Sequence, residues 1–105
     1  MKHITSEAEY ASFLENNLYA LIQFGTSMCA PCQAIEARLD VWNQVPCLYI
    51  STNDFSKLCA QNQVYTAPTL RFYRKGKCLL QVSGYFSLDE FLQQIQRILE
   101  WDEEK

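Results

Sequence analysis

The sequence predicts an α/β domain in which helices cover both faces of one mixed central sheet, so that the chain forms a three-layer α/β/α sandwich. Three observations support this prediction. Apolar runs of strand length alternate with amphipathic helical patterns along the chain. The turn Lys75-Gly76-Lys77 joins two consecutive strand patterns, which indicates a C-terminal antiparallel hairpin. The 105 residues suffice for one hydrophobic core without a linker or repeat, so we expect a single domain over residues 1–105.

Each element predicted in the first half of the chain has its own local signal. Ser6-Glu7-Ala8-Glu9 is a capping box, which is typical of a helix N-terminus. The run over 18–24 is almost wholly apolar, as expected for a central strand covered on both faces. Ile35, Leu39 and Trp42 recur at the i, i+4, i+7 spacing of a helix. The predicted elements are a short strand near 2–4, a helix ending near residue 16, strands over 18–24 and 47–50, and a helix over about 30–43.

The second half continues the alternation and closes with the hairpin and a long helix. Asn53-Asp54 can cap a short helix, and Pro68 breaks the chain before the next strand. Ser87-Leu88-Asp89-Glu90 is a second capping box. The predicted elements are a short helix after residue 54, strands over 69–74 and 78–82, a helix from about residue 87, and a solvated tail over 101–105. Because strands joined through a helix usually run parallel, only the hairpin is expected to add an antiparallel strand.

Two thiols stand where the strand over 18–24 gives way to the following helix. Their motif is Cys29-Ala30-Pro31-Cys32, and its two-residue gap lets the sulfurs meet across one turn as a disulfide. The dipole and the unpaired N–H groups of a helix N-terminus favour thiolate over thiol. Pro31 suits the first turn because its φ is already helical. We therefore expect Cys29 to be an exposed nucleophile and Cys32 a shielded resolving thiol, at the end of the sheet where open α/β folds place their chemistry.

Two other interpretations of the motif can be weighed against redox chemistry. One CxxC is half of a zinc site, but structural zinc sites usually need a second pair or a CxxH partner. The sequence has no second CxxC, and its one histidine, His3, is far from the motif. The two cysteines could also be incidental core residues. A proline between them at a strand–helix junction disfavours this interpretation, because it indicates that the local backbone geometry serves the motif. The motif therefore favours redox chemistry, and we expect neither a metal nor a cofactor.

The composition argues against several other classes of protein. Nine basic and twelve acidic residues give a net charge of −3, which is unlike a general binder of nucleic acid or of anionic membranes. No apolar run approaches ~18 residues, so no transmembrane helix is expected. The first residues lack the apolar core of a signal peptide, and five cysteines are an odd number for a disulfide framework. We expect a cytoplasmic monomer in a reducing compartment.

The remaining cysteines, Cys47, Cys59 and Cys78, are scattered singly along the chain. They could regulate the protein through glutathionylation or dimerisation. A lone cysteine on an apolar face is more often a small core residue, and we prefer that interpretation for all three.

Several features taken together resemble the thioredoxin family from about residue 1 to residue 101. They are the strand over 20–24, Cys29-Ala30-Pro31-Cys32, Ala67-Pro68-Thr69, the Lys75-Gly76-Lys77 turn, and Gly84 before the last helix. The resemblance implies the thioredoxin fold, a cis peptide bond before Pro68 packed against the disulfide, and a groove that docks substrate peptides. The residues expected to bind substrate in that groove are Met28, Ala30, Pro31, Ala67, Pro68 and Gly84.

The sequence also departs from the family pattern around the motif. Met28 and Gly25 stand where ordinary thioredoxins have tryptophan, and Ala30 stands where they have glycine. Gln23 replaces a buried aspartate on the central strand, and Tyr49 replaces a lysine on the neighbouring strand. In ordinary thioredoxins this buried aspartate lies near the resolving thiol. Gln23 leaves the matching position in this sequence without an ionisable group.

Glu36 is predicted to supply the acid–base group that Gln23 cannot. It lies four residues after Cys32, so it falls one turn along the same helix face. If that face meets the sheet, Glu36 points beneath Cys32 and towards Gln23, which could hold it by a hydrogen bond. The alternative is a glutamate on a partly solvated helix flank with no particular partner.

The expected function is that of a cytoplasmic thiol–disulfide oxidoreductase acting on protein disulfides or on proteins that carry a thiol cap. Cys29 would attack the substrate disulfide, and Cys32 would then displace the reduced substrate from the mixed disulfide. A reductant such as a thioredoxin reductase or a low-molecular-weight thiol would regenerate the dithiol. The alternative function is a non-enzymatic interaction module that keeps the fold and a dithiol that does not turn over.

Overall fold

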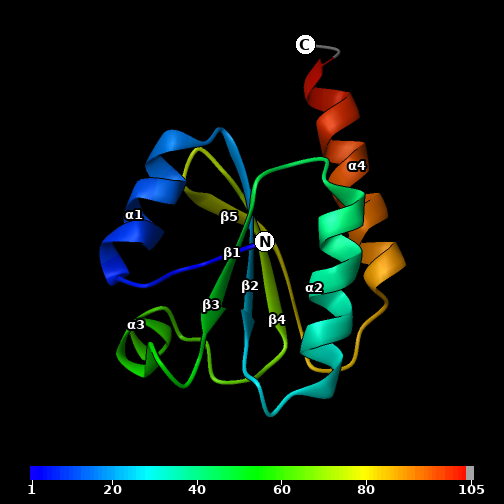
Figure 1. The fold of residues 1–105 in the computed structure, drawn as a ribbon. Coiled ribbons are helices and arrows are strands. Elements are labelled where there is room, and N and C mark those ends of the chain that lie inside the picture. The colour runs from blue at the N-terminus through cyan, green and yellow to red at the C-terminus, as the bar shows by residue number, and fades with distance from the viewer. Residues whose placement is uncertain (104–105) are drawn as a thin grey trace.

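Apolar runs of five to seven residues become the three central strands of a sheet that has five strands within the described residues, in the order β1-β3-β2-β4-β5. The computed structural model describes residues 1–103 (Figure 1). The strands are β1 (Lys2–His3), β2 (Tyr19–Gly25), β3 (Cys47–Ser51), β4 (Thr69–Arg74) and β5 (Lys77–Ser83). The central strand, β2, is buried along almost its whole length, which explains why its sequence does not alternate between apolar and polar residues.

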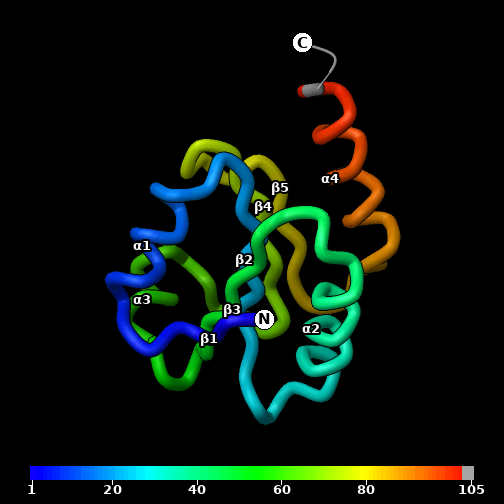
Figure 2. Tube along the Cα trace, turned by 45° about the horizontal axis from the view of Figure 1, so that its top comes forward, coloured from blue at the N-terminus to red at the C-terminus, as the bar shows by residue number. Residues whose placement is uncertain are grey.

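Four helices cover the sheet, two on each face. They are α1 (Glu7–Asn16), α2 (Ala30–Trp42), α3 (Ser56–Gln61) and α4 (Leu88–Glu103). Helices α1 and α3 lie on one face and α2 and α4 on the other (Figures 1 and 2). The predicted three-layer sandwich with a mixed sheet is therefore confirmed. No helix within residues 1–103 is both long and apolar enough to cross a membrane.

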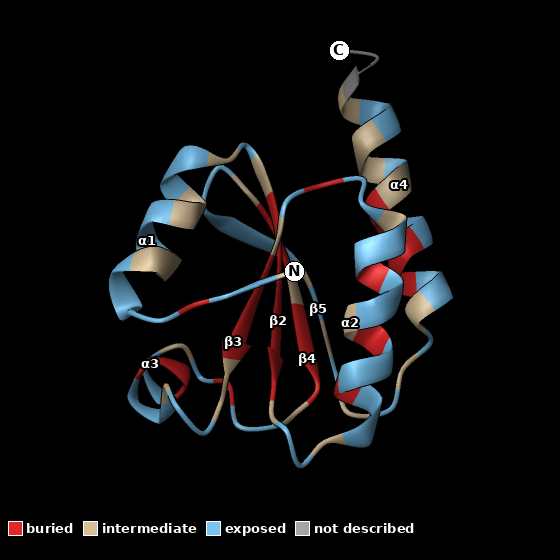
Figure 3. Cartoon of the chain, in the orientation of Figure 1, coloured by how far each residue is buried: buried red, intermediate tan, exposed pale blue. Residues whose placement is uncertain are grey.

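The two faces of the sheet carry separate hydrophobic clusters. Successive strand residues point to opposite faces, so β2 places Ile22 and Phe24 in the cluster under α1 and α3 and Leu21 in the cluster under α2 and α4. The buried residues concentrate on the central strands and on α2, α3 and α4 (Figure 3). The polar Gln23 is the exception on β2, because it is fully buried on the face that α2 covers.

The prediction that only the hairpin is antiparallel is wrong for β4. Strands β1 and β2 run parallel to β3, but β4 pairs antiparallel with β2. The six-residue α3 is about 9 Å long, which is too short to carry the chain back along the sheet. Strand β3 ends at Ser51 beside Gly25, and β4 begins at Thr69 beside Phe24, at the same end of β2. This reversal brings the residue before β4, Pro68, to the end of the sheet where the cysteine motif lies.

The predicted helix starts are partly right. Ser87 accepts a hydrogen bond from the Glu90 backbone N–H at 3.2 Å, as the second capping box requires. Ser6 makes no such cap, and the Glu9 carboxylate accepts from the Thr5 N–H at 3.0 Å instead. The short helix α3 has no side-chain cap either, so Asn53 and Asp54 do not cap it.

The predicted solvated tail is wrong for its first residues, because α4 continues through Trp101 and Asp102. The Asp102 carboxylate accepts a hydrogen bond from the Arg74 guanidinium at 3.1 Å and another from the Tyr19 hydroxyl. These bonds attach the last described turns of α4 to β4 and β2. The rest of the predicted tail, residues 104–105, lies outside the described residues.

Candidate active site

The cysteine motif lies at the carboxyl end of β2. A short loop leaves β2 at Gly25, and the Cys29 N–H donates to the Thr26 carbonyl at 3.1 Å. Cys29 is the N-cap of α2 in an extended conformation, and Pro31 stands in the first turn, where a missing N–H costs no hydrogen bond. The predicted strand–helix junction is confirmed.

Cys29 and Cys32 form a disulfide, with their Cα atoms 5.4 Å apart. Their surroundings differ, because Cys29 is half-buried whereas Cys32 has no exposed surface. A substrate sulfur can therefore approach Cys29 from solvent, while α2 and the sheet enclose Cys32.

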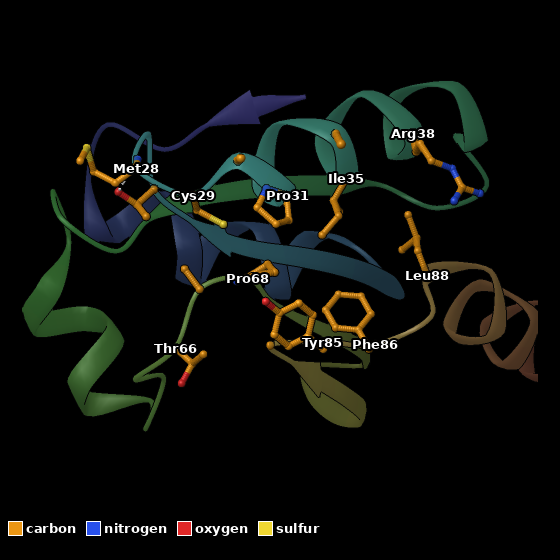
Figure 4. A pocket seen from close by; sticks show the side chains of 15 residues that line it. Met28, Cys29, Pro31, Ile35, Arg38, Thr66, Pro68, Tyr85, Phe86 and Leu88 are labelled. Atoms are coloured by element: carbon orange, nitrogen blue, oxygen red, sulfur yellow. Dashed lines mark hydrogen bonds between the residues drawn. The ribbon is translucent and has the colours of Figure 1, made fainter.

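An apolar groove of about 730 Å³ runs past Cys29. The Ala67–Pro68 peptide bond is cis, as the resemblance implies, and the Gly84 N–H donates to the Pro68 carbonyl at 3.0 Å. Pro68 lies between α2 and the segment after β5 (Figure 4). All six residues predicted to bind substrate line this groove: Met28, Ala30, Pro31, Ala67, Pro68 and Gly84.

The structure adds groove residues that sequence reasoning missed. Tyr85 and Phe86 form the wall opposite Pro31 and Ile35 (Figure 4), and Tyr85 is fully exposed. The signal for Tyr85 was its position directly after Gly84. A further set follows a helical spacing of four along α2 from Ala30: Ala34 and Arg38.

The groove is mainly apolar, and Arg38 brings a charge to one end of it. The Arg38 guanidinium pairs with the Asp89 carboxylate at the start of α4. This ion pair links α2 to the start of α4, and the other residues that line the groove are uncharged.

Beneath the disulfide, the fully buried Gln23 supports the helix backbone. Its Nε2 atom donates a hydrogen bond to the Cys32 carbonyl at 2.7 Å. Its Oε1 atom is buried without a hydrogen-bond partner among residues 1–103. Gln23 therefore binds the first turn of α2 to β2, and its remaining polar atom is an acceptor.

The predicted contact between Glu36 and Gln23 is wrong. Glu36 Oε2 lies 2.7 Å from Nε2 of His3 on β1, and the His3 ring stacks on the Tyr49 ring with centroids 4.1 Å apart. The physical reason is that the Gln23 amide is already engaged by the Cys32 carbonyl, whereas the β1 edge offers Glu36 a basic partner. Burial, and to a lesser degree Glu36, raises the pKa of the Tyr49 phenol.

The three other cysteines have free thiols in different environments. Cys59 is buried, as predicted, and Cys47 is half-buried. The prediction of a core position is wrong for Cys78, which lies on the edge strand β5 and is exposed. Burial raises the pKa of the Cys47 thiol to about 11 and raises that of Cys59, and partial desolvation of the sulfur raises the pKa of Cys78 although the residue as a whole is exposed. Within residues 1–103 no three His, Cys, Asp or Glu side chains cluster as metal ligands.

Comparisons with known proteins agree with this geometry. The thioredoxin family profile matches residues 1–97. Thioredoxin of Oryctolagus cuniculus is 24% identical over 90 residues, which cover 80% of this chain and 86% of that protein. Thioredoxin 1 of Plasmodium falciparum is 22% identical over 88 residues, which cover 80% of this chain and 85% of that protein.

Solved structures show the same fold. A mutant thioredoxin of Halobacterium salinarum superimposes with a TM-score of 0.82 and 21% identity, covering 91% of this chain and 88% of its own. Thioredoxin f2 of Chlamydomonas reinhardtii gives a TM-score of 0.81 with 21% identity, covering 92% of this chain and 94% of its own.

Proposed function

The chain belongs to the thioredoxin family and is a thiol–disulfide oxidoreductase, and from that premise we propose that it reduces disulfides in protein substrates, including those formed with a small thiol cap. The observation that carries the proposal is the unequal exposure of two bonded sulfurs at an apolar groove. Cys29 is reachable from the groove, and Cys32 is not. Such a pair suits an attack that starts at one sulfur and ends at the other.

In the proposed reaction, the Cys29 thiolate attacks one sulfur of the substrate disulfide. A bond forms between Cys29 and that sulfur, and the substrate's second sulfur leaves as a thiolate that takes up a proton. The Cys32 thiolate then attacks the Cys29 sulfur, and the first substrate sulfur leaves. The protein is now oxidised, and two electrons from a thioredoxin reductase or a low-molecular-weight thiol restore the dithiol.

The groove supports substrates that present an apolar, extended segment around their disulfide. Met28 and Tyr85 are exposed apolar side chains on its rim, and such patches are typical of binding surfaces. We propose that Ala67, Pro68 and Gly84 contact the substrate backbone, since these small or ring-closed residues leave the floor of the groove accessible.

A reducing compartment, the cytoplasm, is the proposed location. Three of the five cysteines carry free thiols. An oxidising compartment would expose such thiols, above all the exposed Cys78, to uncontrolled pairing. Expression of the full chain followed by fractionation of the host cell would test this proposal, and recovery from an oxidising compartment would contradict it.

Reduction of insulin disulfides with dithiothreitol tests the activity. We expect the wild-type protein and Cys78→Ser to accelerate insulin precipitation equally, because Cys78 lies far from the groove on β5. Cys29→Ser should give no acceleration over dithiothreitol alone. Equal rates for wild type and Cys29→Ser would overturn the proposed function.

A further inference from the structure

A row of polar side chains crosses the sheet directly beneath the first turns of α2. Tyr49 on β3 pairs in register with Gln23 on β2 and with His3 on β1. Residues opposite each other on neighbouring strands point to the same face, so all three lie on the face that α2 covers. From the helix, Cys32 and Glu36 point towards this row, because they are one turn apart on the inner side of α2.

The Tyr49 hydroxyl and the resolving sulfur both lie beside the space that Gly25 leaves open. A Cβ atom built on Gly25 would lie 2.4 Å from the Tyr49 hydroxyl oxygen and 3.0 Å from the Cys32 sulfur. The hydroxyl and the sulfur therefore border the same small space and are separated by no more than the sum of those distances. Tyr49 is buried, so little solvent can compete for this position.

Two other polar side chains near Cys32 are directed at partners other than its sulfur. Gln23 directs one N–H of its Nε2 atom at the Cys32 carbonyl, and its free Oε1 atom can only accept. The Glu36 carboxylate is also an acceptor, and it is engaged with His3. The Tyr49 hydroxyl, which borders the same space as the sulfur, can donate its proton in a hydrogen bond to a thiolate there.

We propose that the Tyr49 hydroxyl donates a hydrogen bond to the Cys32 sulfur once the Cys29–Cys32 bond is open, and that this bond stabilises the thiolate that resolves the mixed disulfide. The inference rests on the proposed function, because it assigns Cys32 the resolving step. In that step the Cys32 thiol gives its proton to water, and the thiolate attacks the Cys29 sulfur. The bond between Cys29 and the substrate sulfur breaks, and the substrate sulfur leaves with the electron pair and takes up a proton.

The groups facing Tyr49 decide whether the phenol acts as a donor or as a base. Helix α2 presents Cys32 and Glu36, β1 presents His3, and β2 presents the neutral Gln23. Burial first, and the Glu36 charge second, raises the pKa of the phenol above its usual value. Tyr49 therefore keeps its proton at neutral pH and serves as a hydrogen-bond donor. Glu36 and His3 act through Tyr49 and are positioning residues.

Stopped-flow reaction of the reduced protein with 5,5′-dithiobis(2-nitrobenzoate) separates the two thiol steps. Attack by Cys29 releases one nitrothiophenolate, and resolution by Cys32 releases a second from the same mixed disulfide. Cys32→Ser identifies the second phase by abolishing it, and it also measures the background from the other thiols. Absence of a rapid first phase in the wild-type protein would count against the proposed function rather than against the role of Tyr49.

Tyr49→Phe is the decisive variant, because it removes the hydroxyl and keeps the ring that stacks on His3. We expect an unchanged first phase, a second phase about tenfold slower at pH 7, and a shift of its pH midpoint to higher pH by about one unit, as for loss of a hydrogen bond to a charged group. Tyr73→Phe is the matched control, since Tyr73 is a buried tyrosine in the cluster on the opposite face of the sheet. A second phase with the same rate and midpoint in Tyr49→Phe and wild type would overturn the proposal.

Discussion

On its outer side the Cys29–Cys32 disulfide faces apolar side chains, whereas on its inner side it faces polar ones. The outer side is the groove, with Met28 and Tyr85 on its rim. The inner side is the buried row that includes Gln23 and Tyr49. The two sides therefore serve different tasks. The apolar groove binds varied substrates without selecting for charge, and the buried polar row stabilises the charge that develops on sulfur, out of reach of the substrate.

The largest expected effect comes from removing either of the two active-site sulfurs in turn. Cys32→Ser keeps the exposed nucleophile and should accumulate mixed disulfides with lysate proteins, whereas Cys29→Ser should trap none and lose activity by at least about 100-fold. Non-reducing gels of lysate passed over each immobilised variant measure the trapping. Equal trapping by both would mean that the outer sulfur is not the attacking one.

The second effect concerns Cys47, which lies on the same strand as Tyr49 under α2. Burial, together with the Asp40 charge, raises the pKa of Cys47 from 9.0 to about 11. Because the folded pKa is the higher one, the unfolded thiol ionises first, and the stability that this thiol contributes is lost as pH rises from about 9 to 11. We expect the free energy of unfolding to fall by about 2 kcal/mol in this window.

Urea unfolding at several alkaline pH values, compared between wild type and Cys47→Ala, measures this loss. The variant should lose less stability than wild type between pH 9 and 11, with the same slope against urea. A wild-type curve that falls no more steeply than that of Cys47→Ala would show that the thiol is as solvated in the folded protein as in the unfolded one.

The third effect tests whether the outer side recognises substrate by apolar contact. Tyr85→Ala should raise KM for a protein disulfide by about three- to tenfold with little change in kcat, since it removes a large and fully exposed side chain from the groove. Tyr65→Ala is the matched control, because Tyr65 is 80% exposed and lies outside the groove lining. A similar KM change in both variants would indicate a non-specific surface effect.

The smallest effect is expected for Glu36→Gln. The contact between Glu36 and His3 lies near the surface, where even a pair of full charges contributes about 0–1 kcal/mol. We expect a resolution rate within about threefold of wild type, because Glu36 reaches the sulfur only through Tyr49. A loss of resolution as large as that of Tyr49→Phe, measured by the same stopped-flow reaction, would return the acid–base role to Glu36 itself.

The sequence predicted the elements that have strong local signals. The bounds of α2 and β4 agree with the predicted ranges, because proline, apolar spacing and a hairpin turn all lie within a few residues of them. The direction of β4 could not be predicted from residues near it, since it depends on whether α3 is long enough to carry the chain back along the sheet. The cis bond before Pro68 was implied by resemblance alone, because the proline itself is compatible with either isomer.

The candidate site divides in the same way. Cys29 and Cys32 were found from their spacing, and their unequal burial follows from helix geometry. The partner of Glu36 was missed because both Gln23 and His3 lie within its reach across the sheet. Which of them Glu36 contacts depends on the hydrogen bonds that Gln23 already makes. The role inferred for Tyr49 depends on the empty space at Gly25, which no pattern in the sequence reveals.

The residue before Cys29 has a spectroscopic consequence. The chain holds two tryptophans, and the position beside the reactive sulfur is occupied by Met28. Trp42 lies ten residues beyond Cys32, about 15 Å along the axis of α2, and Trp101 lies near the end of α4 that points away from the motif (Figure 1). Neither indole adjoins the sulfur pair, so fluorescence emission should barely change between oxidised and reduced protein. Met28→Trp would place a fluorophore next to the disulfide and give the protein an optical report of its own redox state.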